Sequence, residues 1–229
     1  MKIIGLIGGM SWESTVTYYQ QINRLTATQL GGLHSAKLLL YSVDFEEIEA
    51  CQTSGDWKKS AQILAQAAQS LERAGAELIL ICTNTMHKVA PQVQASVSIP
   101  LLHIADATAD ALEEAHISTV ALLGTKYTMC ETFYTNKLIQ RGIQVLIPDK
   151  ADAELVNRVI FQELCLGQHK DSSKAEFLRI INALGAQGAQ GVILGCTEIG
   201  LLISQSDTAL PIFDTTLIHA ERAVRIALQ

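Results

Sequence analysis

The segments GAELILICTNT (residues 75–85) and GAQGVILGCTE (residues 188–198) share one pattern. Each begins with glycine and alanine, continues as an apolar run typical of a buried strand, and ends in polar residues. Gly75 and Gly188 are separated by 113 positions (188 − 75), and so are Thr83 and Cys196 (196 − 83). The pattern indicates that one strand and the turn after it occur twice in the chain.

The repeat extends to both sides of these segments. Ile99-Pro100 matches Leu210-Pro211 at an offset of 111, and IGLIG (residues 4–8) matches VALLG (residues 120–124) at an offset of 116. Further apolar runs typical of strands lie at residues 37–41 and 145–147. A helix is expected over residues 57–74, which are rich in Ala, Gln and Leu and are followed by a glycine.

Alternating buried strands and helices predict an α/β fold with mainly parallel sheets flanked by helices. We expect two pseudo-symmetric domains, the first formed by residues 1–98 and 210–229 and the second by residues 99–209, with an active site in the cleft between them. Any two parallel strands in an α/β protein look alike, which is the alternative explanation of the repeat. The shared order of strands and prolines favours a true duplication.

The composition excludes several functional classes. The chain has 229 residues, of which 48% are hydrophobic and 17% charged, so disorder is not expected. A net charge of −6 argues against nucleic-acid binding. The apolar run at residues 3–10 is interrupted by glycines and is too short to span a membrane. We expect a cytoplasmic protein without membrane or nucleic-acid partners.

The five cysteines are scattered singly, without a C-x-x-C pair, which argues against a disulfide framework or a structural zinc site. Cys196 differs from the others because it follows a glycine at a strand end and precedes two polar residues. We predict that Cys196 is functional. The other four are expected to be packing or pocket-wall thiols: Cys51, Cys82, Cys130 and Cys165.

Thr83 and Cys196 follow equivalent strands, and ligands of parallel sheets lie beyond the carboxyl ends of strands. If a dyad relates the halves, the two side chains face each other across the cleft. Such a pair suits stereochemical inversion, because one group removes a proton from one face of a carbon and the other returns a proton to the opposite face. A thiol, with a pKa of about 8.5, can serve as the base once its site lowers that pKa.

Polar residues near these two positions are candidates for substrate binding. Asn84, Thr85, Thr197 and Glu198 would open the helices after the strands, where hydroxyls and backbone N–H groups can hold a carboxylate. They could also be simple helix caps. Gln52 could reach a substrate or be a solvated loop residue.

Two further features stand near the predicted strand ends. His87, four residues after Thr83, could tune the site or be a surface or capping residue. The turn at residues 8–11 can bring backbone N–H groups to an anion, although it lacks the spacing of a dinucleotide-binding fingerprint.

Residues 4–11, 83–87 and 195–198 resemble the aspartate/glutamate racemase family, and the resemblance runs over the whole chain. It is strongest to the bacterial L-aspartate/glutamate-specific racemases, also described as broad-specificity amino-acid racemases. The resemblance implies a homodimer and racemisation of a small amino acid without pyridoxal phosphate or metal. The positions that match the family's substrate-binding residues are Met10, Ser11, Gln52, Asn84, Thr85, Thr128, Thr197 and Glu198.

The usual family motif is Cys-Asn-Thr, whereas this chain has Thr83 in the cysteine position. The L-specific subgroup has the same change. The resemblance therefore implies that Cys196 removes the α-proton of the L-substrate and that Thr83, or a water it holds, serves the opposite face. Cys82 is one residue earlier and should point to the other side of the strand. Cys165 occupies the place of a lysine that binds the side-chain carboxylate in two-cysteine aspartate racemases, so glutamate or a wider substrate range is plausible.

The expected function is a cofactor-independent racemase of L-aspartate and/or L-glutamate. One alternative is another reaction on a related fold, namely that of a hydantoin racemase, a maleate isomerase or an arylmalonate decarboxylase. The other is a small-ligand binding protein that lost turnover through the cysteine-to-threonine change.

Overall fold

The computed structural model describes all 229 residues and divides into two compact units. Unit 1 contains Met1–Ile104 and His219–Gln229, and unit 2 contains Ala105–Ile218. Both boundaries lie later in the chain than the sequence predicted. The reason is strand pairing: Leu101 still bridges to the sheet of unit 1, and Ile212–Asp214 forms a strand in the sheet of unit 2.

Unit 1 has a parallel sheet of three strands in the order β2-β1-β3, which are β1 (Ile4–Gly8), β2 (Leu38–Ser42) and β3 (Leu78–Ile81). Leu101 adds a parallel bridge beside Ile79 of β3. The helices of unit 1 are α1 (Trp12–Leu30), α2 (Phe45–Ser54), α3 (Trp57–Arg73), the 3-10 helix η1 (Thr85–Val89), α4 (Ala90–Gln94) and most of α11 (Thr215–Ala227).

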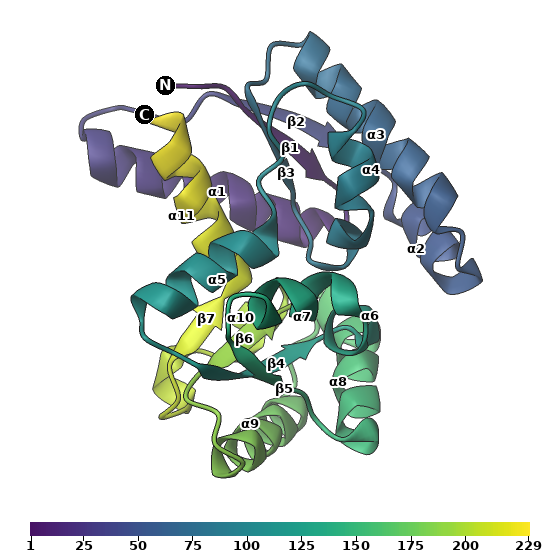
Figure 1. The fold of residues 1–229 in the computed structure, drawn as a ribbon, viewed down its shortest axis with the longest axis vertical. Helices are drawn as coiled ribbons and strands as arrows, with labels where there is room; N and C mark the ends of the chain where they lie inside the picture. The colour runs from purple at the N-terminus through teal and green to yellow at the C-terminus, as the bar shows by residue number, and fades with distance from the viewer. The chain divides into compact units, whose positions relative to one another are not determined.

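Helices cover both faces of this sheet (Figure 1). Successive strand side chains point to opposite faces, so Ile79 and Ile81 pack with α2, α3 and α4, whereas Leu78 and Leu80 pack with α1 and α11. Burial on both faces explains why the strands consist of nearly uninterrupted apolar residues.

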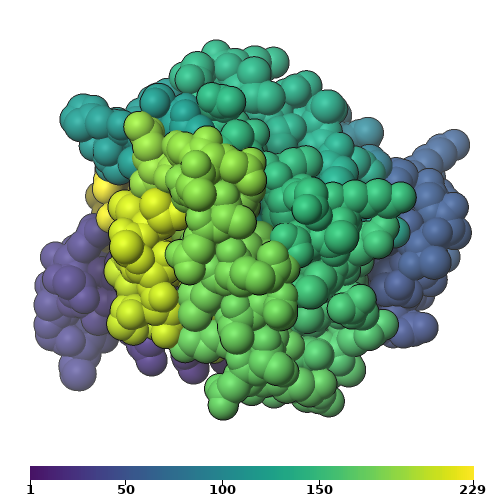
Figure 2. All heavy atoms as spheres, turned by 90° about the horizontal axis from the view of Figure 1, so that it is seen from below, coloured from purple at the N-terminus to yellow at the C-terminus, as the bar shows by residue number.

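Unit 2 has a parallel sheet in the order β5-β4-β6-β7, which are β4 (Thr119–Gly124), β5 (Gln144–Leu146), β6 (Val192–Gly195) and β7 (Ile212–Asp214). Its helices are α5 (Ile104–Glu114), α6 (Lys126–Cys130), α7 (Thr132–Ile139), α8 (Lys150–Gln162), η2 (Leu164–Leu166), α9 (Asp171–Ala186), α10 (Ile199–Leu202) and η3 (Gln205–Asp207). Helices α6, α8 and α9 contact β4, and α9 keeps its polar side at the molecular surface, in the green part of Figure 2.

The two units confirm the predicted repeat. The bridge between Ile79 and Leu101 in unit 1 is equivalent to the pairing of Val192 with Ile212 in unit 2, at the offsets of 113 (192 − 79) and 111 (212 − 101). The glycines that precede β3 and β6 have φ angles of 99° and 104°, a backbone conformation that L side chains rarely adopt. This explains why both halves of the repeat begin with glycine.

The repeat also holds for a buried side-chain pair. The Tyr18 hydroxyl lies 2.8 Å from His219 Nδ1 in unit 1, and the Tyr134 hydroxyl donates to Thr108 Oγ1 at 3.2 Å in unit 2. Tyr134 is 116 positions after Tyr18, and His219 is 111 positions after Thr108 (219 − 108). The first pair joins α1 to α11, and the second joins α7 to α5.

The chain passes from unit 1 to unit 2 at the beginning of α5 and returns within α11. Each of these helices packs in the unit into which it runs. In unit 2, Asp106 of α5 forms an ion pair with Lys137. In unit 1, Ala220 and Val224 of α11 belong to the core. None of the helices is long and apolar enough to cross a membrane.

Candidate active site

The predicted site residues form one group in each unit. The Thr83 group, in unit 1, consists of Met10, Ser11, Gln52, Thr83, Asn84 and Thr85, and the Cys196 group, in unit 2, consists of Thr128, Cys196, Thr197 and Glu198. The central members of both groups follow the carboxyl ends of parallel strands, as predicted: Thr83 comes after β3 and Cys196 after β6.

Cys196 and Glu198 are hydrogen-bonded to each other. The thiol donates to Glu198 Oε2 at 3.0 Å, and the same oxygen accepts a hydrogen bond of 2.6 Å from the Thr197 hydroxyl. The short turn between β6 and α10 brings the three consecutive side chains together. Glu198 is only 3% exposed, so it is a buried carboxylate that gathers two donors from its own segment.

The surroundings of Cys196 raise the pKa of its thiol well above the usual value. Burial is the largest cause, followed by the negative charge of Glu198 and then by Cys165. A thiol base requires a lowered pKa, and the groups around Cys196 have the opposite effect. These surroundings therefore favour the protonated thiol over the thiolate.

Thr128 and Cys165 lie in the same unit as Cys196. Thr128 is fully buried, and its Cγ2 packs 3.2 Å from the place that a Cβ would occupy on Gly195, directly before Cys196. Burial, and then the charge of Glu198, raise the pKa of Cys165 to about 12. Cys165 is thus a neutral, partly buried thiol near Glu198, and its role in a pocket wall stays a prediction.

Cys82 is a core residue. It is fully buried in the cluster that β3 forms with α1 and α11, and burial alone raises the pKa of its thiol strongly. The next residue, Thr83, is half-buried after the end of β3. The prediction that Cys82 is a packing residue is confirmed.

Two side chains hold the backbone at the end of β3. The Ser14 hydroxyl donates to the carbonyl of Cys82 at 2.9 Å, and His87 Nδ1 lies 2.8 Å from the carbonyl oxygen of Thr83. Ser11, at the N-cap of α1, accepts a hydrogen bond from the Ser14 amide, which connects the turn after β1 to the turn after β3. Ser14 was not predicted, because its contact spans 68 residues and leaves no local sequence signal.

The remaining residues of the Thr83 group are buried. Gln52 lies in α2 and donates to Met86 Sδ at 3.2 Å, so it is not a solvated loop residue. Met10 packs in the core cluster of α2 and α3. Thr85 opens η1 and is buried.

Asn84 precedes η1 and Glu198 precedes α10, as expected for residues at helix starts, but neither side chain caps its helix. The simple-cap explanation therefore does not apply to these two side chains. No group of three or more His, Cys, Asp and Glu side chains is arranged to hold a metal ion.

The sequence and fold match known proteins over almost the whole chain. The Asp/Glu/Hydantoin racemase family model matches residues 7–223. The chain is 24% identical to the broad specificity amino-acid racemase RacX of Bacillus subtilis (strain 168), over 97% of this chain and 96% of that protein.

Two solved structures are similar over 100% of both chains. A putative Asp/Glu racemase from Yersinia pestis has 56% identity and a TM-score of 0.94. An aspartate racemase homologue from Pyrococcus horikoshii OT3 has 38% identity and a TM-score of 0.88. These similarities agree with the α/β fold of two parallel sheets described above.

Proposed function

The chain belongs to the Asp/Glu/hydantoin racemase family and is an isomerase, and we propose that it racemises L-aspartate and/or L-glutamate by two-base proton transfer without a cofactor. The observation that carries this proposal is the buried hydrogen bond from the Cys196 thiol to Glu198 at the end of β6. Cys196 can serve as the base that removes an α-proton. Glu198 can accept the proton that the thiol must first lose.

Cys196 acts on the L-substrate in this proposal. Glu198 takes the thiol proton, and the ammonium group of the substrate favours the thiolate by its positive charge. The thiolate then removes the α-proton, so that the Cα–H bond breaks, an S–H bond forms and the electron pair remains on the α-carbon. A raised thiol pKa makes the thiolate a stronger base, which suits the removal of a proton from a weak carbon acid.

Thr83 serves the opposite face of the α-carbon. Its hydroxyl, or a water that it holds, donates a proton to the carbanion. Before the next turnover, solvent restores that proton and takes up the proton that Glu198 received. Alcohols are much weaker acids than thiols, so removal of a proton from the D-enantiomer is expected to be the slower direction. Substrate carboxylates are proposed to bind the polar residues of both groups, with Thr128 and Gln52 among them.

The decisive experiment is proton exchange in D₂O with a panel of L- and D-amino acids. We expect deuterium at the α-carbon of aspartate and/or glutamate, together with the opposite enantiomer on chiral chromatography. Absence of exchange with every acid over a broad pH range contradicts the proposal.

Three further assays separate the alternatives. Exchange of a hydantoin but not of an amino acid would indicate a hydantoin racemase, and a covalent thiol adduct with maleate would indicate an isomerase of that compound. Thermal stabilisation by aspartate or glutamate without α-proton exchange would indicate a binding protein.

We further propose that the protein is a homodimer and acts in the cytoplasm. Sedimentation equilibrium tests the first statement, because a homodimer has twice the mass of the 24.8 kDa chain.

A further inference from the structure

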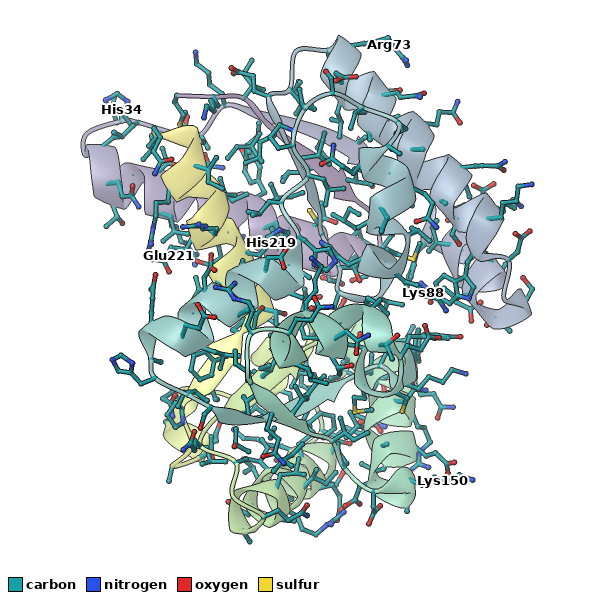
Figure 3. All side chains as sticks on the ribbon, in the orientation of Figure 1. His34, Arg73, Lys88, Lys150, His219 and Glu221 are labelled. Atoms are coloured by element: carbon teal, nitrogen blue, oxygen red, sulfur yellow. The ribbon has the colours of Figure 1, made fainter.

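Two histidines of unit 1 meet beside the Thr83 loop. His87 of η1 is 1% exposed, and His219 of α11, which Figure 3 labels, is completely buried. Their rings lie edge to face with centroids 5.7 Å apart, and the His103 ring lies 4.6 Å from that of His87, tilted by 56°. Buried imidazoles require a hydrogen-bond partner at each nitrogen, and those partners define the protonation state of each ring.

The partners of His87 assign one neutral tautomer. The backbone N–H of Ile104 donates to Nε2 at 3.2 Å, so this nitrogen carries no proton. The proton is therefore on Nδ1, which donates to the carbonyl oxygen of Thr83 at 2.8 Å. In a doubly protonated ring, Nε2 would also be a donor and would face the N–H donor of Ile104. The geometry therefore requires a neutral ring.

The partners of His219 assign the other tautomer. The carbonyl oxygen of Leu102 can only accept, so His219 Nε2 carries the proton and donates at 2.9 Å. Nδ1 then accepts the hydroxyl proton of Tyr18 at 2.8 Å. The two histidines thus hold the main chain at Leu102 and Ile104, and His87 connects this segment to Thr83.

The two histidines accompany Thr83 and have no histidine counterpart in unit 2, although the Tyr134–Thr108 pair is equivalent to Tyr18–His219. The repeat offsets place Gly200 at the position of His87 (200 − 87 = 113) and Thr108 at the position of His219. A Cβ on Gly200 would lie 2.6 Å from Asp214 Oδ2, so a side chain there would require the Asp214 carboxylate to move. The duplicated fold therefore does not require the histidines. Their presence in unit 1 alone indicates a role that is specific to the unit that contains Thr83.

We propose that His87 is a positioning residue for Thr83, with His219 and Tyr18 holding the segment to which His87 is attached. The proposal rests on the proposed function. A hydrogen bond to the Thr83 carbonyl fixes the orientation of that peptide group and, with it, the direction of the Thr83 side chain. Positioning matters most for a weak acid, because a hydroxyl group transfers a proton only from a near-ideal geometry.

Two substitutions separate the two hydrogen bonds of His87. In His87→Asn, the amide nitrogen takes the place of Nδ1, so the bond to Thr83 is kept and the bond to Ile104 is lost. In His87→Gln, the amide group reaches the place of Nε2, so the bond to Ile104 is kept and the bond to Thr83 is lost. His34→Gln, at an exposed histidine of the same unit, is the control.

The measurement compares deuterium in recovered L-substrate with D-enantiomer formed, both from one reaction in D₂O. Cys196 alone produces the first, whereas the second also needs Thr83. We expect His87→Gln to raise this exchange-to-inversion ratio by about tenfold and His87→Asn to keep it within about twofold of wild type. Equal ratios in all variants would overturn the proposal, because a purely structural defect lowers both products together.

Nitrogen-15 NMR of the imidazole rings provides a second readout that does not depend on activity. We expect the Nδ1–H tautomer for His87 and the Nε2–H tautomer for His219 at pH 7. A charged ring or an Nε2–H tautomer at His87 would overturn the proposal while leaving the racemase reaction intact. Conversely, absence of any α-proton exchange in the wild-type protein would overturn the proposed function and the role of His87 with it, even where the tautomers are as expected.

Discussion

The Cys196 thiol and the Glu198 carboxylate form a buried donor–acceptor pair, with Sγ 3.0 Å from Oε2. The pair has two opposite electrostatic effects. The negative charge of Glu198 disfavours the thiolate and raises the thiol pKa, yet the carboxylate is also the nearest acceptor for the thiol proton. We therefore expect Glu198 to favour the protonated thiol and, in the proposed reaction, to accept its proton.

Glu198→Gln separates these two effects. Removal of the charge lowers the pKa of Cys196, so alkylation of the thiol by neutral iodoacetamide at pH 8 should become faster. Removal of the proton acceptor should lower kcat for the L-substrate by about 100-fold. Mass spectrometry of the alkylated peptide and chiral chromatography measure the two outcomes. A variant with slower alkylation would show that the carboxylate activates the resting thiol.

Glu154→Gln is the matched control, because Glu154 is an exposed carboxylate of α8 in the same unit. It removes the same net charge without touching Cys196. Both the alkylation rate and kcat should remain those of the wild-type protein.

Cys82 and Cys196 should respond to substitution in opposite ways. Cys196→Ser should abolish α-proton exchange while changing stability little, because the hydroxyl keeps the hydrogen bond to Glu198 and is a far weaker acid. Cys82→Ala should retain exchange but lower the free energy of unfolding by about 1 kcal/mol, since it leaves a small cavity in the α1/α11 core. Urea unfolding and the exchange assay together decide the matter. Loss of exchange in Cys82→Ala with an intact fold would show that the thiol acts one residue earlier than proposed.

Thr83→Cys should increase turnover of the D-enantiomer by about tenfold, because a thiol loses its proton much more readily than an alcohol. Thr83→Ala should instead depress turnover in both directions. The final mixture stays equimolar in every active variant, since the enantiomers have equal free energy. Initial rates from pure L- and pure D-substrate are the measurement. A D-rate in Thr83→Cys that equals wild type would contradict the assignment of this face to residue 83.

Gly195→Ala should disturb the Cys196 group from within the sheet. An added Cβ would lie 2.9 Å from Leu122 Cδ1, 3.0 Å from the carbonyl oxygen of Leu123 and 3.2 Å from Thr128 Cγ2. Such overpacking is expected to lower the free energy of unfolding by about 2 kcal/mol.

The control is Gly185→Ala within α9, where the added methyl meets only the end of the Leu210 side chain at 3.3 Å. Alanine is the better helix former, so this variant should be as stable as wild type or more so. Denaturant unfolding compares the two. Equal stability of both alanine variants would mean that the atoms around Gly195 shift to accommodate the added methyl group.

The strands could be predicted because their residues are apolar on both faces, and β3 has the boundaries that its run of Leu and Ile indicated. Strand β7 was missed, because Ile212–Asp214 has only three residues and follows a proline. The second domain was therefore predicted to end at residue 209, whereas unit 2 ends at Ile218. The position of Cys196 directly after a buried strand was predictable from its local motif. The roles of Ser14 and His219 could not be predicted. Ser14 bonds to a residue 68 positions away and His219 to residues 117 and 201 positions away, and these contacts depend on how the helices pack on the sheet.

His219 makes stability depend on pH with a defined sign. Burial, and then the neighbouring His87, lower the pKa of His219 from 6.5 to about 3 in the folded protein. The unfolded chain therefore binds more protons than the folded chain between these values. The stabilisation is complete above pH 6.5 and is lost as the pH falls toward 3. Between pH 7 and pH 5, this one residue should lower the free energy of unfolding by about 2 kcal/mol.

His219→Gln tests this dependence, because glutamine can still donate to the Leu102 carbonyl but has no ring to protonate. The variant should be less stable than wild type at pH 7, where the hydrogen bond with Tyr18 is lost, and the difference should shrink by about 2 kcal/mol at pH 5. His34→Gln, at an exposed histidine of the same unit, is the control. Urea unfolding at pH 5, 6 and 7 measures all three proteins. Parallel curves for wild type and His219→Gln would show that His219 accepts a proton inside the folded unit, and would contradict its assignment as a neutral ring.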